Sequence, residues 1–191
     1  MKRITLLCLA IMLSTCALAQ KVKKTKKAKN TATTTVAEVV NNDVIHWYSM
    51  QQALELNKKA PRKFIIDVYT DWCGWCKVMD KSTFTDTSVA HLINKYYYAV
   101  KFNAEGNDTI VMQGKTFTNA NYGKRGGTHP LAQSLLSGKM SYPTTVYLDE
   151  TLGMLSPVAG YLKPEDINPI LKYFGTMAYK TQSFEEFKKT K

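Results

Sequence analysis

Residues 63–76 limit what this chain can fold into more than any other part of its sequence. Residues 63–69 read KFIIDVY, an almost unbroken run of β-branched and aromatic side chains, which is typical of a central strand buried on both faces. Two cysteines, Cys73 and Cys76, follow at once, and the pattern after them predicts a helix over about residues 74–81. The pair therefore lies where a buried strand passes into a helix.

This position suits the two cysteines to disulfide exchange. That reaction needs a thiolate that attacks a disulfide and a second thiol close enough to resolve the mixed disulfide. Cys73 lies at the predicted N-terminus of the helix, where free N–H groups and the helix dipole stabilise a thiolate, and Cys76 lies one turn further on the same face. We therefore expect Cys73 to be the attacking thiol, and to be more exposed than Cys76.

The remaining pattern predicts an α/β fold with a mixed central sheet flanked by helices. A capping box of Ser49 and Gln52 starts one helix, which ends at Ala60 and Pro61. Further helices are predicted over residues 86–94 and 130–136, from Pro164, and over 183–188; further strands are predicted over residues 96–103, 144–148 and 155–158. Residues 108–118 predict a hairpin and residues 119–128, rich in Gly and Asn, a loop. Helices between strands, followed by two adjacent late strands, indicate the mixed sheet.

The first residues have the pattern of an export signal. A short basic stretch precedes the apolar residues 4–13, and Ala17-Leu18-Ala19 supplies small residues at a cleavage site. We therefore expect residues 1–19 to be a signal peptide and the exported product to be periplasmic, with Gln20 as its first residue. An alternative is a lipobox at residues 13–16, which would make the protein a membrane-anchored lipoprotein through Cys16.

Charge and cysteine content support this division of the chain. Of 26 basic residues, 18 lie from residue 43 onward together with 14 acidic ones, so much of the formal charge of +11 belongs to the N-terminal part. This argues against a nucleic-acid partner. We expect residues 20–42, rich in Lys and Thr, to be a disordered tether, or alternatively a segment attracted to anionic membrane.

Cleavage of the signal peptide would remove the other two cysteines and leave only Cys73 and Cys76. A disulfide between these two closes a very short loop and adds little stability, so we expect the pair to serve chemistry.

At Trp72-Cys73-Gly74-Trp75-Cys76-Lys77 the chain resembles the thioredoxin superfamily, and in particular secreted thioredoxin-like thiol–disulfide oxidoreductases of bacterial envelopes. Trp75 stands where proline is usual. The resemblance covers about residues 44–174. It implies a thioredoxin-like domain over residues 43–191, with an insertion at about 105–129, before the cis-proline segment, and a C-terminal helical extension at about 178–191.

The resemblance also implies roles for individual residues. Asp67 falls where the family keeps a buried aspartate that accepts the proton of the second cysteine, and Lys101 where a lysine neighbours that aspartate. Tyr142-Pro143 looks like the cis-proline segment where the substrate backbone docks, and Gly160 matches a glycine on the same side. Trp72, Gly74 and Trp75 would complete the substrate-binding surface.

Each role has an alternative. The cysteines could bind zinc, but His46, His91 and His129 are scattered and no second ligand pair has metal spacing. Attachment of c-type haem would need a histidine where Lys77 stands. Asp67 could serve only to pair with Lys101, Pro143 could be an ordinary trans proline, and Trp72 could be a packing residue.

The sequence thus predicts a thiol–disulfide oxidoreductase that acts on the thiols and disulfides of exported proteins through Cys73 and Cys76, and we expect it to work in the reducing direction. We expect no metal and no cofactor beyond the Cys73–Cys76 disulfide. A reducing electron donor, such as a membrane thiol-transfer protein, would restore the dithiol. No dimerisation domain is recognisable, so we expect a monomer. The alternative is a polypeptide-binding or chaperone-like module on the same scaffold, which would use Trp75, Tyr142 and the inserted hairpin.

Overall fold

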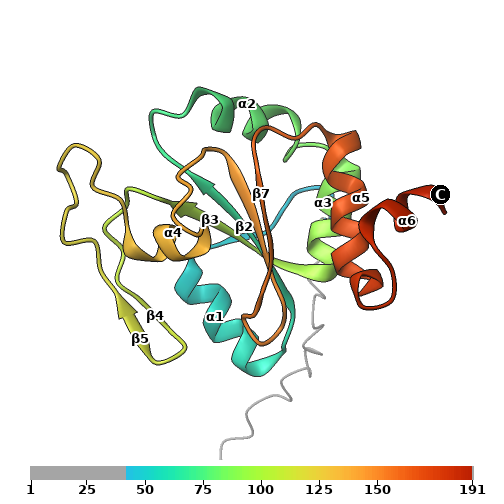
Figure 1. The fold of residues 1–191 in the computed structure, drawn as a ribbon, viewed down its shortest axis with the longest axis horizontal. Coiled ribbons are helices and arrows are strands. Elements are labelled where there is room, and N and C mark those ends of the chain that lie inside the picture. The colour runs from blue at the N-terminus through green and yellow to red at the C-terminus, as the bar shows by residue number, and fades with distance from the viewer. Residues whose placement is uncertain (1–41, 191) are drawn as a thin grey trace, which may run out of the picture. The chain divides into compact units, whose positions relative to one another are not determined.

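The computed structural model describes residues 42–190, which form a five-stranded mixed sheet with helices on both faces (Figure 1). The strand order is β1-β3-β2-β6-β7. The strands are β1 Trp47–Tyr48, β2 Lys63–Tyr69, β3 Tyr97–Asn103, β6 Thr144–Leu148 and β7 Met154–Ala159. β1, β3 and β2 run parallel, whereas β6 and β7 are antiparallel to their neighbours. The predicted fold class is confirmed. The expected signal peptide, and all of the expected tether except residue 42, lie outside the described residues.

Two groups of helices cover the sheet. The helices are α1 Met50–Lys59, α2 Gly74–Ser82, α3 Thr87–Tyr96, α4 Pro130–Leu135, α5 Pro164–Gly175 and α6 Phe184–Lys189, with a 3-10 turn η1 at Ala178–Lys180. One hydrophobic core joins α1 and α4 to one face of the sheet, and a second joins α3 and α5 to the other (Figure 1). No helix within residues 42–190 has both the length and the apolar character that crossing a bilayer requires.

Strand β2 lies in the centre of the sheet, paired with β3 on one edge and β6 on the other, and six of its seven residues are buried. Its side chains alternate between the two cores: Phe64 and Ile66 face the core of α1 and α4, and Ile65 faces the core of α3 and α5. Asp67 lies two residues after Ile65 and so shares the face of the second core, which also contains Met79 of α2. The almost continuous apolar run in the sequence reflects this burial on both sides.

Local signals in the sequence set most of the element boundaries. The Ser49–Gln52 capping box starts α1, as expected, and Ala60 ends it. Asp86, expected as the first residue of a helix, is the N-cap of α3, since its carboxylate accepts the N–H groups of Ser88 and Val89. Strand β1 was not expected, because a strand of two residues leaves no periodicity to detect.

The insertion carries a small two-stranded sheet, and its residues Ile110 and Met112 pack into the core that contains α1 and α4. The expected hairpin is present as β4 Ile110–Met112 and β5 Lys115–Phe117, joined at Gln113 and Gly114, both of which have positive φ. The segment ends at His129, whose backbone N–H donates to the carbonyl of Ala104 at 2.7 Å. The ring of His129 is fully buried; its Nδ1 accepts the N–H of Leu131, so Nε2 carries the proton and donates to the carbonyl of Asp108 at 2.9 Å.

Candidate active site

Cys73 and Cys76 form a disulfide at the start of α2, with their Cα atoms 5.4 Å apart. Cys73 is the N-cap of the helix, and its Sγ accepts the backbone N–H of Cys76 at 3.1 Å. An N-cap sulfur lies where the unpaired N–H groups and the positive end of the helix dipole are concentrated. Surroundings of this kind stabilise a negative charge on sulfur.

Exposure does not distinguish the two sulfurs, contrary to our expectation. Cys73 is 4% exposed and Cys76 2%, so both are buried in the disulfide form. The reason is that the side chain of Cys73 is turned onto its own helix, where it is bonded to Cys76 and capped by its N–H. The difference between the two residues therefore lies in their position relative to the helix N-terminus.

Asp67 lies under the helix as a buried carboxylate and is only 1% exposed. Its Oδ2 accepts a hydrogen bond from Lys101 Nζ at 2.6 Å, because Asp67 and Lys101 occupy the same register position on β2 and β3. Among the described residues, its Oδ1 has no partner, nor has the buried hydroxyl of Thr145, which faces Asp67 across the β2–β6 pair. The expected neighbour relation of Asp67 and Lys101 is confirmed, and one carboxylate oxygen stays available.

Lys101 has a second carboxylate partner that the sequence analysis missed. Its ammonium group also contacts Asp80 of α2, which lies one turn after Cys76. The same ammonium group lies over three aromatic rings, at 4.9 Å from the centroid of Trp47, 5.1 Å from Phe84 and 5.4 Å from Tyr69. An i, i+4 relation to Cys76 was the only signal for Asp80 in the sequence, and it does not distinguish this residue from an ordinary surface aspartate.

Burial and neighbouring charges shift the pKa values of Asp67 and Lys101 in opposite directions. Burial raises the pKa of Asp67 above its ordinary value, and the nearby ammonium of Lys101 only partly offsets this effect. Burial acts to lower the pKa of Lys101, but the two carboxylates outweigh it, so that this pKa is raised. The charged form of Lys101 is therefore favoured, whereas burial favours the protonated form of Asp67.

The peptide bond between Tyr142 and Pro143 is cis, as predicted. The segment is fixed from β7, because the N–H of Gly160 donates to the carbonyl of Pro143 at 2.8 Å. Gly160 has a φ of +99°, a backbone conformation that residues with a Cβ rarely adopt. This turn brings Gly160 and Tyr161 beside Pro143, where they share one hollow with Trp75.

Two tryptophans form the exposed rim of the site, Trp72 at 66% and Trp75 at 62% exposure. Trp72 is also held in place: its Nε1 donates to Glu105 at 3.0 Å, and its ring meets that of Tyr142 edge-on, with centroids 5.8 Å apart. Glu105 is the first residue of the insertion, and no sequence pattern connects it with Trp72. Gly74, between the tryptophans, is exposed, and no atom lies within 4 Å of where its Cβ would be.

Trp75 makes one wall of a hollow of about 290 Å³, which is lined by Trp75, Tyr142, Pro143, Gly160 and Tyr161. The rings of Trp75 and Tyr161 are 5.5 Å apart and tilted by 36°. The hydroxyl of Tyr161 is hydrogen-bonded to Ser82 near the end of α2, at 3.1 Å. The position of the Tyr161 ring is thus fixed independently of any bound molecule.

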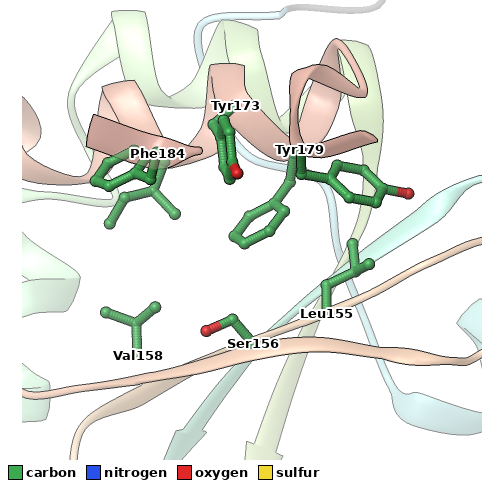
Figure 2. Close-up of a pocket in the computed structure, with 8 residues that line it drawn as sticks. Leu155, Ser156, Val158, Tyr173, Tyr179 and Phe184 are labelled. Atoms are coloured by element: carbon green, nitrogen blue, oxygen red, sulfur yellow. The ribbon is translucent and has the colours of Figure 1, made fainter. Parts of the chain in front are cut away.

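A second hollow, of about 480 Å³, lies between β7 and the helices α5 and α6 (Figure 2). Its walls are mainly aromatic and aliphatic, formed by Leu155, Ser156, Val158, Ile170, Tyr173, Phe174, Tyr179 and Phe184. None of these residues belongs to the cysteine segment or to the hollow beside Pro143. Within residues 42–190, no group of three or more His, Cys, Asp or Glu side chains is arranged to hold a metal ion.

Comparisons with known proteins agree with this geometry. The model of the family Thioredox_DsbH, described as a protein of unknown function (DUF255), matches residues 25–156. An uncharacterized protein of Caenorhabditis elegans is 25% identical over 135 residues, which are 69% of this chain and 16% of that protein. The thiol:disulfide interchange protein DsbD of Vibrio vulnificus is 40% identical over 47 residues, 25% of this chain and 8% of that protein.

The chain thus spans less than a fifth of the length of either of these relatives. Among solved structures, a thioredoxin-fold protein from Helicobacter pylori matches with a TM-score of 0.52 and 14% identity, over 78% of this chain and 88% of that one. A likeness at this identity establishes the fold.

Proposed function

Because the chain belongs to the Thioredox_DsbH family, a thioredoxin-type family, we propose that it is a thiol–disulfide oxidoreductase that reduces disulfides in exported proteins. The observation that carries this proposal is the position of the Cys73–Cys76 disulfide. Its first sulfur caps α2 and accepts a helix N–H, which is the arrangement that activates a thiolate.

The reaction takes place in two exchanges. In the reduced protein, the thiolate of Cys73 attacks one sulfur of the client disulfide; a Cys73–client disulfide forms, and the other client sulfur leaves as a thiolate that takes up a proton. The thiol of Cys76 then loses its proton and attacks Cys73 Sγ. The Cys73–Cys76 disulfide forms, the second client sulfur leaves, and one electron pair has passed from the protein to the client.

Asp67 accepts the proton of Cys76 in the second exchange. Burial raises its pKa, and a carboxylate with a raised pKa is a better proton acceptor. Its Oδ1 has no other partner among the described residues, whereas Oδ2 is held by Lys101. Lys101 acts as a positioning residue that fixes the carboxylate under α2.

The cis-proline segment binds the client backbone. An extended client strand would pair with the chain at Tyr142, and the backbone contacts would give affinity without a requirement for sequence. The exposed rings of Trp72 and Trp75 and the backbone at Gly74 complete the surface on which the client lies.

The reducing direction requires an electron donor. No histidine stands between the cysteines to favour the thiolate further, so Cys-Gly-Trp-Cys lacks one feature of strong oxidants. We assign the protein to the periplasm after removal of residues 1–19, and a membrane thiol-transfer protein as its donor. The DsbD relative, by its name, catalyses thiol:disulfide interchange, which supports this assignment.

A polypeptide-binding module on the same scaffold is the second candidate. The exposed aromatic rim and the hollow beside Pro143 favour it, since both would serve binding without redox turnover. Reduction of insulin by dithiothreitol, followed as turbidity, separates the two functions. An oxidoreductase accelerates the reaction, and Cys73→Ser abolishes the acceleration. A wild-type protein that binds unfolded polypeptide without accelerating insulin reduction would favour the binding module.

A further inference from the structure

The second hollow, which we call the β7–α5 hollow, has the size and lining of a ligand site (Figure 2). Its volume of about 480 Å³ lies in the lower part of the range of roughly 300–1,000 Å³ that ligand cavities occupy in proteins. Of its eight lining residues only Phe174 is fully buried, so the hollow is open to solvent. A small apolar group can therefore enter it from outside.

Strand β7 makes the floor of the hollow. The pairing of β6 with β7 shifts in register between Tyr147 and Leu148, and such a shift disturbs the alternation of side chains along the strand. The consecutive residues Leu155 and Ser156 therefore both line the hollow, together with Val158. The floor is apolar except for one hydroxyl group.

The roof of the hollow is a layer of aromatic rings in contact with one another. The centroid of the Tyr173 ring lies 5.2 Å from that of Phe184 and 6.4 Å from that of Tyr179. The ring of Phe174 lies 5.7 Å from that of Tyr179. The hydroxyl of Tyr173 donates to the carbonyl of Gln182 at 2.8 Å, which fixes the ring in the middle of the layer. The roof thus keeps its form without a ligand.

Two lysines bring positive charge to the roof. The ammonium group of Lys180 lies 6.0 Å from the centroid of the Tyr179 ring, and that of Lys188 lies 5.5 Å from the centroid of the Phe184 ring. Both lysines are exposed, and neither makes an ion pair with any residue between 42 and 190. Their charges are therefore available to a bound anion.

Most carboxylates in this region already have partners. Asp149 and Glu150 lie near the roof. Asp149 accepts two backbone N–H groups of the turn after β6, and Glu150 pairs with Lys63 at 2.6 Å. On α6, Glu186 is held in the capping box of the helix, which leaves Glu185 as the exposed acid. The unpaired charge beside the hollow is therefore positive on balance.

We propose that the β7–α5 hollow binds the alkyl chain of a free fatty acid, with the carboxylate held by Lys180 and Lys188. An alkyl chain suits an apolar and aromatic lining, and each buried CH₂ group adds to the affinity. A volume in the lower part of the ligand range favours one chain over the two of a phospholipid. None of the lining residues belongs to the cysteine segment, so the inference is independent of the proposed function.

Calorimetric titration of the full-length oxidised protein tests the inference with three ligands, each below its micelle concentration. Decanoate should bind with one molecule per chain. Octanoate should bind about tenfold more weakly, because two fewer CH₂ groups are buried. Decyltrimethylammonium has the same chain as decanoate but a cationic head, and it should bind about tenfold more weakly than decanoate.

Variants separate the role of the chain from that of the head group. Ser156→Trp fills the hollow from its floor and should abolish the binding of decanoate. The double variant Lys180→Gln/Lys188→Gln should weaken decanoate about threefold and bring the affinities for the two ions close together. The matched control Lys58→Gln/Lys59→Gln removes the same charge from α1, on the other face of the sheet, and should leave both affinities unchanged. Urea denaturation checks that each variant is folded.

Three outcomes would overturn the inference: no binding of decanoate, binding that survives in folded Ser156→Trp, or equal affinities of the wild type for the two ions. If Ser156→Trp does not fold, the lysine variants decide, and a decanoate affinity unchanged in Lys180→Gln/Lys188→Gln would be fatal to the inference. A dimer of the wild type in sedimentation velocity that Ser156→Trp dissociates would identify a second copy of the chain as the occupant, and would also overturn it.

Discussion

Replacing Asp67 with asparagine should stabilise the oxidised protein at pH 8. Asp67 is 1% exposed, and only one of its two oxygens has a partner among the described residues. Burial raises its pKa, so ionisation at pH 8 opposes folding by about 1.4 kcal/mol for each unit by which the pKa is raised. Asparagine has nearly the same shape and removes this penalty. Lys101 keeps a carboxylate partner in Asp80, so the change leaves no isolated buried ammonium group. We expect a gain in the free energy of unfolding of about 1–3 kcal/mol.

The pH dependence gives the sign of the effect independently. A group whose pKa is raised by folding contributes its stability below the unfolded pKa, about 3.9 for aspartate, and loses it as the pH rises through the folded pKa. The wild type and Asp67→Asn should therefore differ little at pH 4 and diverge toward pH 8. Urea denaturation of both oxidised proteins across this range measures the difference as a shift of the midpoint at constant slope.

Asp80→Asn is the matched control. Asp80 contacts the same ammonium group, but its side chain is 43% exposed, so its removal should change the free energy of unfolding by less than about 1 kcal/mol. A wild type that is more stable than Asp67→Asn at pH 8 would refute the reasoning. It would mean that the attraction of Lys101 exceeds the cost of burial and that folding lowers the pKa of Asp67.

Four further outcomes follow from the proposed roles. On non-reducing gels, Cys76→Ser should accumulate mixed disulfides with client proteins, whereas Cys73→Ser should trap almost none; equal trapping by both would contradict the division of roles. The double variant Asp67→Asn/Cys76→Ser should trap clients as well as Cys76→Ser does. The single variant Asp67→Asn should reduce insulin more slowly than the wild type, and an unchanged turnover would exclude Asp67 as the proton acceptor. Equilibration with glutathione should give a redox potential of roughly −270 to −180 mV, and a value near −120 mV would indicate an oxidant. Intact mass of the native protein should place the N-terminus at Gln20, whereas a diacylglyceryl group on Cys16 would identify a lipoprotein.

Much of the fold could be predicted because its signals are local. The run of residues 63–69, the capping box at Ser49 and the proline at the start of α5 each act on neighbouring residues, and the elements begin and end close to where they indicate. The disulfide at the start of α2 could also be predicted from a local signal, because the strand, the two cysteines and the helix follow one another in one short stretch of sequence. Strand β1 is too short to give such a signal.

The parts of the site that could not be predicted depend on contacts between distant residues. Glu105 reaches Trp72 across 33 positions, and Tyr161 reaches Ser82 across 79. No local sequence pattern indicates either contact, because each of these side chains could equally lie on a solvated surface. The low exposure of Cys73 was missed for a related reason, since it depends on how the side chain packs rather than on its place in the helix.

The closure of the insertion at Ala104 and His129 has a practical consequence for protein engineering. The insertion begins and ends beside two residues joined by one backbone hydrogen bond, and its residues 121–126 are exposed. Lengthening a loop whose ends are held together has a small entropic cost, about 0.6 kcal/mol for each doubling of its length. A peptide tag or a fluorescent reporter inserted at residues 121–126 should therefore be carried by a folded, redox-competent protein. The same insertion beside Glu105 would instead pull on the hydrogen bond that holds Trp72.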